Sequence, residues 1–367
     1  MAVPFIDLKR FEPGFLDQWN KKVSELTLNT QFLGGPEVSG LEASLSRNNS
    51  VKHSIGCANG TDAIQLALRG AGIGKNDTVL VPDSTFWATF EAVVNVSAEP
   101  VTVDINRNDL QMDFDLFCEA AEKYKPKAAI LVHLYGWGSS KLKEFREFSR
   151  KNNIHLIEDG AQAYGVEFKG NSIYSGAYSS TISFYPAKVL GAAGDAGAVL
   201  CDEDALAKRI ISLGNHGREE HYAHGSVGWN SRIGSLQAAF LNLSLERFGD
   251  RLASRRKTAM QYRKELAGIG MQTVSPPEGY IENGYLNVTL HENSKREALK
   301  KKLSDAGIGF GTVYPGPISE QKGAEGFLKA KVGGENAKWL SQSVLNLPLF
   351  PYMTDQEFEE VISVLKS

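Results

Sequence analysis

The sequence predicts an α/β protein with a large, mainly parallel sheet covered by helices, followed by a smaller α+β domain. From residue 53 onward, short apolar runs alternate with helical patterns, an alternation typical of parallel sheets. The pattern changes after Pro276 and Pro277, and 367 residues exceed the size at which one hydrophobic core stops growing. We therefore expect a large domain over residues 1–250 and a small C-terminal domain over 251–367.

Each element is expected from its hydrophobic period, which is two residues in strands and 3.6 in helices. Seven apolar runs predict the strands of the large sheet: 53–58, 78–81, 100–104, 128–132, 154–158, 180–184 and 197–201. Amphipathic segments predict the helices of the same domain: 62–69, 85–95, 113–124, 141–151, 203–213 and a long pair over 233–267. The small domain is expected to contain strands at 285–290 and 308–313 and helices at 295–306 and 355–366.

Composition and charge exclude several classes of function. The net charge is -3 and the basic residues are spread along the chain, which argues against binding of nucleic acid. The N-terminus does not resemble a signal peptide, and no apolar stretch approaches the roughly 20 residues of a membrane span, so we expect a cytoplasmic protein. Cys57, Cys118 and Cys201 are isolated, which argues against disulfides and against a zinc site, and no metal site is expected.

The segment 57–63 joins a predicted strand to a predicted helix through Gly60 and Thr61. The free N–H groups at such a helix start, together with the helix dipole, favour the binding of an anion. The alternative is simple capping of the helix by the side chain of Asn59, Thr61 or Asp62.

Asp159 follows a predicted strand, at the edge where parallel sheets bind ligands. A carboxylate buried there needs a cationic partner, and a protonated pyridine nitrogen would supply one. Asp159 can equally cap the following turn or pair with an arginine.

Lys188 follows the next predicted strand and leads into the Gly- and Ala-rich loop 191–197. Small residues allow a ligand to approach closely, and desolvation lowers the pKa of an amine toward the range where it is a nucleophile. A single lysine is more often a solvated surface residue. The order of an anion-binding turn, a strand-end Asp159 and a strand-end Lys188 favours a functional site.

With these motifs, the chain resembles the DegT/DnrJ/EryC1/StrS family of sugar aminotransferases, a branch of the aspartate-aminotransferase-like (type I) fold of pyridoxal-phosphate enzymes. The resemblance covers nearly the whole chain and includes the segments 5–8, 32–38 and 345–351. It implies pyridoxal 5'-phosphate as cofactor, with pyridoxamine 5'-phosphate as the intermediate form.

The resemblance also implies roles for individual residues. Lys188 would bind the cofactor covalently and transfer the proton, Asp159 would contact the pyridinium nitrogen, and Gln162 would bond to the cofactor hydroxyl. The remaining contacts would come from Phe86, stacked on the ring, and from Gly60, Thr61 and Ser183 at the phosphate. Asn230 would reach the phosphate of a neighbouring subunit, which implies a homodimer with shared active sites; its alternative role is to cap the helix expected to begin near Ile233.

Three positions need separate comment. Ala187 stands where the family often has threonine, and Ser319 stands where it often has histidine, which leaves the substrate contacts of that loop open. His133 lies in a familiar segment, but a histidine at a strand end is more often structural, so we leave it out of the catalytic set.

The implied activity is transfer of an amino group from an amino acid, usually glutamate, to a nucleotide-linked keto sugar. A UDP-linked 2-acetamido-3-keto or 4-keto sugar of surface polysaccharide (lipopolysaccharide) biosynthesis is the expected acceptor, although nothing in the residues requires it. The alternatives are a sugar dehydratase of the same family, in which histidine replaces the lysine, and a non-catalytic cofactor-binding regulatory protein.

Overall fold

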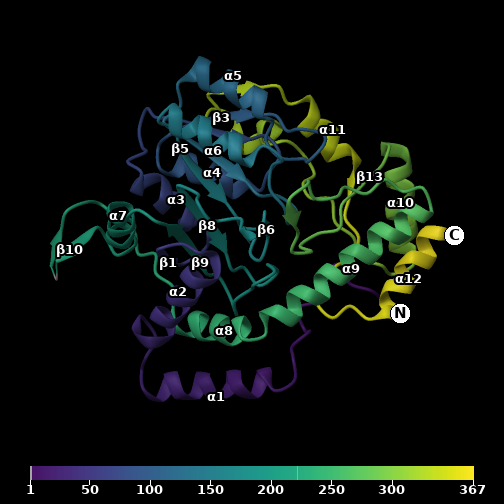
Figure 1. Ribbon diagram of the computed structural model, residues 1–367, viewed down its shortest axis with the longest axis horizontal. Helices are drawn as coiled ribbons and strands as arrows, with labels where there is room; N and C mark the ends of the chain where they lie inside the picture. Colours follow the sequence, from purple (N-terminus) through teal and green to yellow (C-terminus); the bar gives the residue numbers. More distant parts are fainter. Residues whose placement is uncertain (1, 221) are drawn as a thin grey trace.

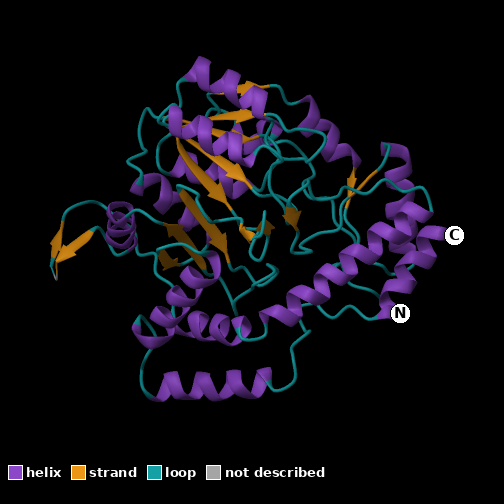
Figure 2. Ribbon diagram, in the orientation of Figure 1, coloured by secondary structure: helices purple, strands orange, loops and turns teal. Residues whose placement is uncertain are grey.

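The computed structural model describes residues 2–220 and 222–367. Helices surround a central sheet, and a second group of helices and short strands lies beside it (Figures 1 and 2). The helices are α1 Phe15–Leu28, α2 Gly35–Asn49, α3 Gly60–Gly70, α4 Trp87–Asn95, α5 Phe114–Tyr124, α6 Leu142–Lys151, α7 Asp204–Gly214, α8 Ser235–Leu245, α9 Phe248–Gly268, α10 Asn293–Asp305, α11 Glu335–Ser343 and α12 Asp355–Lys366. The strands of the central sheet are β1 His53–Cys57, β2 Thr78–Pro82, β3 Glu99–Val103, β4 Ala128–Val132, β5 His155–Asp159, β8 Ser179–Ser183, β9 Gly197–Cys201 and β14 Ala330–Val332. The short strands are β6 Glu167–Phe168, β7 Asn171–Ser172, β10 Arg218–Glu220, β11 Ala223–His224, β12 Tyr280–Ile281, β13 Thr289–Leu290 and β15 Val344–Leu345.

The central sheet has the strand order β1-β9-β8-β5-β4-β2-β3-β14. Only β9 runs against the others, because it pairs antiparallel with both β1 and β8 while the remaining pairs are parallel. The predicted α/β class and all seven predicted strands of the large sheet are confirmed. An eighth strand, β14, comes from the C-terminal part of the chain.

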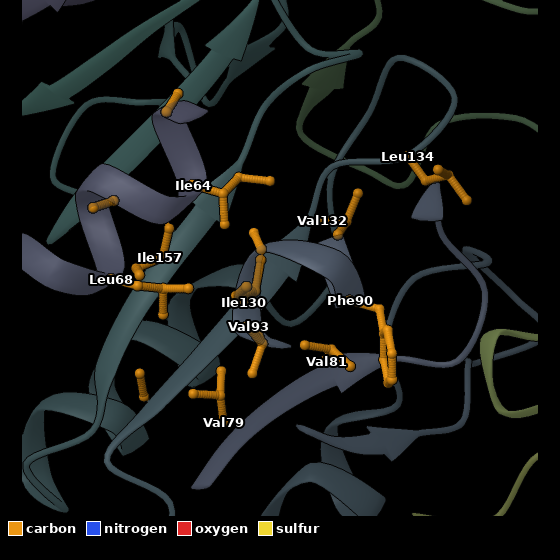
Figure 3. Packing of buried hydrophobic residues seen from close by; sticks show 14 of the residues in the cluster. Ile64, Leu68, Val79, Val81, Phe90, Val93, Ile130, Val132, Leu134 and Ile157 are labelled. Atoms are coloured by element: carbon orange, nitrogen blue, oxygen red, sulfur yellow. The ribbon is translucent and has the colours of Figure 1, made fainter. Parts of the chain in front are cut away.

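Helices cover both faces of this sheet, as its residue pattern requires. Val79 and Val81 of β2 belong to one hydrophobic cluster and Leu80 to the other, because successive side chains of a strand point to opposite faces. Figure 3 shows Ile64 and Leu68 of α3 in the first cluster, with strand residues of β2, β4 and β5. Full burial of each such side chain contributes roughly 1.5–3 kcal/mol to stability.

The C-terminal part differs from the prediction in its strands. The run 285–290 forms a strand only at Thr289–Leu290, and the prediction of a strand at 308–313 is wrong. Isolated bridges replace it, from Ile308 to Val3 and from Gly311 to Asn346. Glycines alternate with Ile308 and Phe310 in this run, and glycine weakens a strand while allowing close backbone approach. The N-terminal segment uses that space, since a Cβ on Gly309 would lie 2.3 Å from the backbone nitrogen of Phe5.

The two parts of the chain are connected through the edge of the sheet. Residues Ala330, Lys331 and Val332 pair with Val101, Thr102 and Val103 of β3, and the carboxylate of Asp104 accepts bonds from the backbone of Gly334, Asn336 and Ala337. The expected domain boundary at residue 250 falls inside α9, and it stays a prediction. Among the described residues, no helix is both long enough and apolar enough to cross a membrane.

Candidate active site

The predicted site residues gather where parallel strands end. Gly60 follows β1, Asp159 ends β5 and Ser183 ends β8. Because these three strands run in the same direction, their carboxyl ends meet at one edge of the sheet. Phe86 follows β2, at the same edge, and Lys188 lies in the loop after β8.

The start of α3 has the geometry of an anion site. A Cβ on Gly60 would lie 2.7 Å from the Cβ of Ser183, so a larger residue would push the helix away from β8. The N–H groups of Gly60 and Thr61 belong to the first helical turn, where no intrahelical acceptor exists. Asn59 caps the helix, since its Oδ1 accepts the N–H of Asp62 at 2.8 Å. The capping alternative is therefore confirmed for Asn59, and it leaves Gly60 and Thr61 free to bind an anion.

Asp159 is a buried carboxylate, with a residue exposure of 5%. Its Oδ1 accepts the N–H of Ala161 at 3.1 Å, and its Oδ2 accepts the hydroxyl of Thr89 at 3.1 Å. Within the described residues, no lysine or arginine pairs with it, so the arginine alternative is wrong, whereas its turn-capping bond to Ala161 is present. Burial raises the pKa of this carboxyl, although the positive charge of Lys188 acts in the opposite direction.

The preceding residue, Glu158, is in the opposite situation. Arg146 donates to both of its oxygens at 2.7 and 2.9 Å, and Nε2 of His133 lies 2.9 Å from Oε2. Burial alone would raise the pKa of Glu158, but the charge of Arg146 and these hydrogen bonds hold it below its ordinary value. His133 is fully buried and hydrogen-bonded to Glu158. These features are those of a structural residue.

Gln162 is buried in the turn after β5, and its side-chain amide both accepts and donates a hydrogen bond. Its Oε1 accepts the backbone N–H of Tyr135 at 2.6 Å, and its Nε2 donates to the hydroxyl of Tyr314 at 2.9 Å. The side chain of Asn283 donates to the carbonyl of Gln162 at 2.9 Å and so fixes the turn.

Lys188 is half-buried, and its Nζ lies 5.3 Å from the centroid of the Tyr285 ring. The amine also lies close enough to Asp159 for its charge to act on that carboxylate. Phe86 is 57% exposed, and its ring centroid lies 5.9 Å from that of Tyr314. An exposed aromatic ring at this strand edge is available to stack on a planar ligand.

Comparison with known proteins identifies the family. The model of the DegT/DnrJ/EryC1/StrS aminotransferase family matches residues 16–366. The chain belongs to this family. It is 34% identical to a UDP-N-acetyl-3-dehydro-alpha-D-glucosamine 3-aminotransferase of Acidithiobacillus ferrooxidans, over 100% of this chain and 97% of the relative. It is also 34% identical to a UDP-2-acetamido-2-deoxy-3-oxo-D-glucuronate aminotransferase of Pseudomonas aeruginosa, over 99% of each chain. The solved structure of DesV from S. venezuelae, in complex with a ketimine intermediate, superposes with a TM-score of 0.93 at 32% identity and covers 100% of this chain and 98% of its own. The predicted type I fold is thereby confirmed.

Ser319, where this chain departs from the family pattern, is held by the large sheet. Its N–H and hydroxyl donate to the carboxylate of Asp83 at 2.7 and 2.8 Å. Asp83 is fully buried at the end of β2, and burial raises its pKa. Ser319 therefore anchors the loop that carries Tyr314.

Sequence reasoning missed three neighbours of the predicted site: Tyr314, Tyr285 and Thr89. Thr89 was placed on a helix, and its bond to Asp159 depends on how that helix packs. The two tyrosines come from the C-terminal part, more than 90 residues from Lys188, and no local motif marks them.

Asn230 does not join the other predicted site residues in the single chain. It is exposed, its Oδ1 accepts from Arg232 at 2.6 Å, and its backbone bridges to Asn215. The helix-capping alternative is wrong, because α8 begins at Ser235 with Gly234 as its cap residue. Asn230 is therefore an exposed residue whose side chain is bonded to Arg232 and to none of the other predicted site residues.

Among the described residues, no three or more histidine, cysteine or acidic side chains gather in a way that could hold a metal ion.

Proposed function

We propose that this family member is a pyridoxal-phosphate-dependent aminotransferase that moves an amino group from an amino acid, glutamate, to a nucleotide-linked keto sugar. The observation that carries the proposal is Asp159, a buried carboxylate without a cationic partner in the described chain, in the same site as the amine of Lys188. A buried carboxylate of this kind is costly unless a cation completes it.

The residues present fit the cofactor at both of its ends. A protonated ring nitrogen would supply the positive charge that Asp159 lacks. The start of α3, with Ser183 packed against Gly60, would hold the phosphate through Gly60, Thr61 and Ser183. Between these ends, Phe86 offers an aromatic face, and Gln162 offers an amide for the ring hydroxyl, in competition with its bond to Tyr314.

The chemistry divides between cofactor and protein. When bound, pyridoxal phosphate supplies the carbonyl that takes up the amino group and the electron sink that stabilises the carbanion. Lys188 supplies the amine that holds the cofactor and moves the proton at the donor Cα, first as base and then as acid. Asp159 keeps the ring nitrogen protonated. In the balanced reaction, the donor's C–N bond breaks and its carbon becomes a ketone, while the sugar ketone becomes an amine.

The relatives support a particular acceptor. Two relatives at 34% identity are named for UDP-linked sugars with an amino group placed at C3. We therefore favour a UDP-linked 2-acetamido-3-keto sugar over the 4-keto isomer, in surface polysaccharide synthesis. Mixing the protein with pyridoxal phosphate, glutamate and each candidate sugar should give an aminated product by mass spectrometry only from the 3-keto sugar. Amination of the 4-keto sugar alone would contradict this choice.

The same experiment separates the alternatives. A dehydratase would give a sugar that has lost a ring hydroxyl and gained no amino group, and the lysine at position 188 disfavours it. A regulatory protein would bind the cofactor without turnover of any donor. The presence of Asp159, Gln162 and Lys188 together disfavours this alternative, because the residues that the resemblance implies for turnover are all retained. The free cysteines Cys57, Cys118 and Cys201 favour the reducing cytoplasm as the compartment.

We also propose a homodimer in which Asn230 completes the phosphate site of the partner. A phosphate dianion needs several donors, and the exposed Asn230 lies in a segment that leads to α8. Mixing inactive Lys188→Ala with inactive Asn230→Asp under subunit exchange should restore part of the activity, because one site of each heterodimer then carries both lesions and the other none. If both residues serve the same chain's site, no activity returns.

A further inference from the structure

Next to Lys188 lies a cavity of about 320 Å³ whose lining carries an excess of positive charge. It is enclosed by the N-terminal segment, the loop after β8, and helices α8 and α9. Its charged side chains are Asp7, Arg10, Lys188, Arg251 and Arg255. The volume is at the small end of those that enclose organic ligands.

Two of the three arginines are neutralised by carboxylates. Arg10 pairs with Asp7 at 2.6 Å and also with Glu357. Arg251 pairs with Glu12 through two hydrogen bonds, at 2.8 and 3.0 Å. These two side chains are therefore components of the scaffold that fixes the N-terminal segment.

Arg255 has no such partner among the described residues. It is only 4% exposed, and its guanidinium donates to two backbone carbonyls, those of Gly284 at 3.2 Å and Leu349 at 3.5 Å. Its Nε is buried without a hydrogen-bond acceptor in the described chain. Burial lowers the pKa of Arg255 to about 10, so it remains a cation at neutral pH. An anion in the cavity would compensate such a buried, unpaired cation.

Arg255 is also connected to Lys188 through one residue. The carbonyl that it binds belongs to Gly284, the neighbour of Tyr285, and Nζ of Lys188 lies 5.3 Å from the centre of the Tyr285 ring. The unpaired guanidinium and the amine thus contact adjacent residues of one segment, Gly284 and Tyr285.

We propose that this cavity binds the amino donor and that Arg255 binds a carboxylate of that donor. The assignment rests on the proposed aminotransferase function, since the donor's amino group must reach the site of Lys188. An amino acid carries a carboxylate close to that amino group, and a planar guanidinium matches a carboxylate through two parallel hydrogen bonds. Arg255 is then a specificity-determining residue for the donor and not for the sugar.

The first test uses binding alone, with glutarate, a dicarboxylate that has no amino group and cannot react. Glutarate should raise the melting temperature of the cofactor-free wild-type protein more than the neutral glutaramide does. The gain should disappear in Arg255→Gln and persist in Arg251→Gln, a matched control one turn away on the same helix and in the same cavity. A gain from glutarate no larger than that from sulfate at equal ionic strength would overturn the assignment.

The second test uses the loaded enzyme. Arg255→Gln should raise the KM for glutamate about 10- to 100-fold and leave the KM for the sugar unchanged, as expected for loss of a hydrogen-bonded charge. If Arg255→Gln does not fold, Arg255→Lys is compared, which keeps the charge but loses the paired geometry; an unchanged KM for glutamate then overturns the proposal.

The two proposals fail in different ways. If the wild type aminates a sugar and the Arg255 variants keep the wild-type KM for glutamate, the donor site is wrong and the function stands. If no donor is turned over but glutarate still stabilises through Arg255, the cavity is a carboxylate site and the function is wrong.

Discussion

The two faces of the end of β5 carry neighbouring carboxylates with opposite charge environments. On one face, Glu158 is fully buried between Arg146 and His133 and has an ion pair with two hydrogen bonds. On the other face, Asp159 has one bond from a backbone N–H and one from a hydroxyl, with no ion pair in the described chain. The two side chains point to opposite faces because they are successive residues of a strand.

This difference separates stability from function. The pair of Glu158 and Arg146 is complete within the chain, so its removal should affect folding. Asp159 has no ion pair in the described chain, and under the proposed function a ligand supplies its counter-charge, so its removal should affect catalysis. The following variants test that division, starting from the largest expected effect.

Lys188→Ala removes the side-chain amine that lies near Asp159 in the proposed active site. Transamination should fall by about 10⁴-fold or more, because one residue both holds the cofactor and moves the proton. In the wild type, borohydride reduction should attach the cofactor to the peptide that contains Lys188, as read by mass spectrometry. Attachment to any other lysine would show that the residue has been misassigned.

Asp159→Asn replaces the unpaired carboxylate by an amide of the same shape. Activity should fall by about 10²- to 10³-fold, as for the loss of other electrostatic partners of a reacting group, because an amide does not hold the ring nitrogen protonated. The variant should still fold, which circular dichroism and urea unfolding would show. Wild-type turnover with the cofactor bound would contradict the role of Asp159.

Glu158→Gln is the matched change on the other face. It leaves the half-buried guanidinium of Arg146 without its counter-charge, and the free energy of unfolding should fall by about 3 kcal/mol. Urea unfolding at pH 7 measures this, and activity per folded molecule should change less than in Asp159→Asn. The reverse pattern, with stability kept and turnover lost, would break the proposed division.

The pH dependence of stability should distinguish the two carboxylates by sign. The pKa of Glu158 is lowered in the fold, so its contribution is present above its unfolded pKa and is lost as pH falls through the folded value. The pKa of Asp159 is raised, so ionisation destabilises the cofactor-free fold, and this cost disappears as pH falls below the folded value. Relative to wild type, cofactor-free Asp159→Asn should gain stability at pH 7 and lose that gain in acid. A stability difference that is constant with pH would show that Asp159 titrates normally.

Sequence reasoning identified the residues whose position follows from strand direction. Gly60, Asp159 and Ser183 are each next to a strand end, so the prediction of a parallel sheet was enough to bring them to one edge. The sequence pattern does not identify Tyr314 or Tyr285. Their contacts with Gln162 and Lys188 depend on how the C-terminal part of the chain packs against the sheet. Sequence reasoning also predicted a strand at 308–313, where alternating glycines allow the N-terminal segment to lie close instead. The role of Asn230 depends on a second chain, which no pattern within one chain determines.

Strand β14 has a consequence for synthesis of the protein. Residues 330–332 emerge from the ribosome late, after the other seven strands of the sheet, and they pair with the outer side of β3. Until then, a nascent chain that has already formed the rest of the sheet exposes the unpaired N–H and C=O groups of β3. Other nascent chains translated from the same mRNA can pair with them. Such open edges promote pairing between chains. β14, the last strand of the central sheet to be made, therefore closes an edge that would promote aggregation, and a chain truncated at residue 250 would keep that edge open.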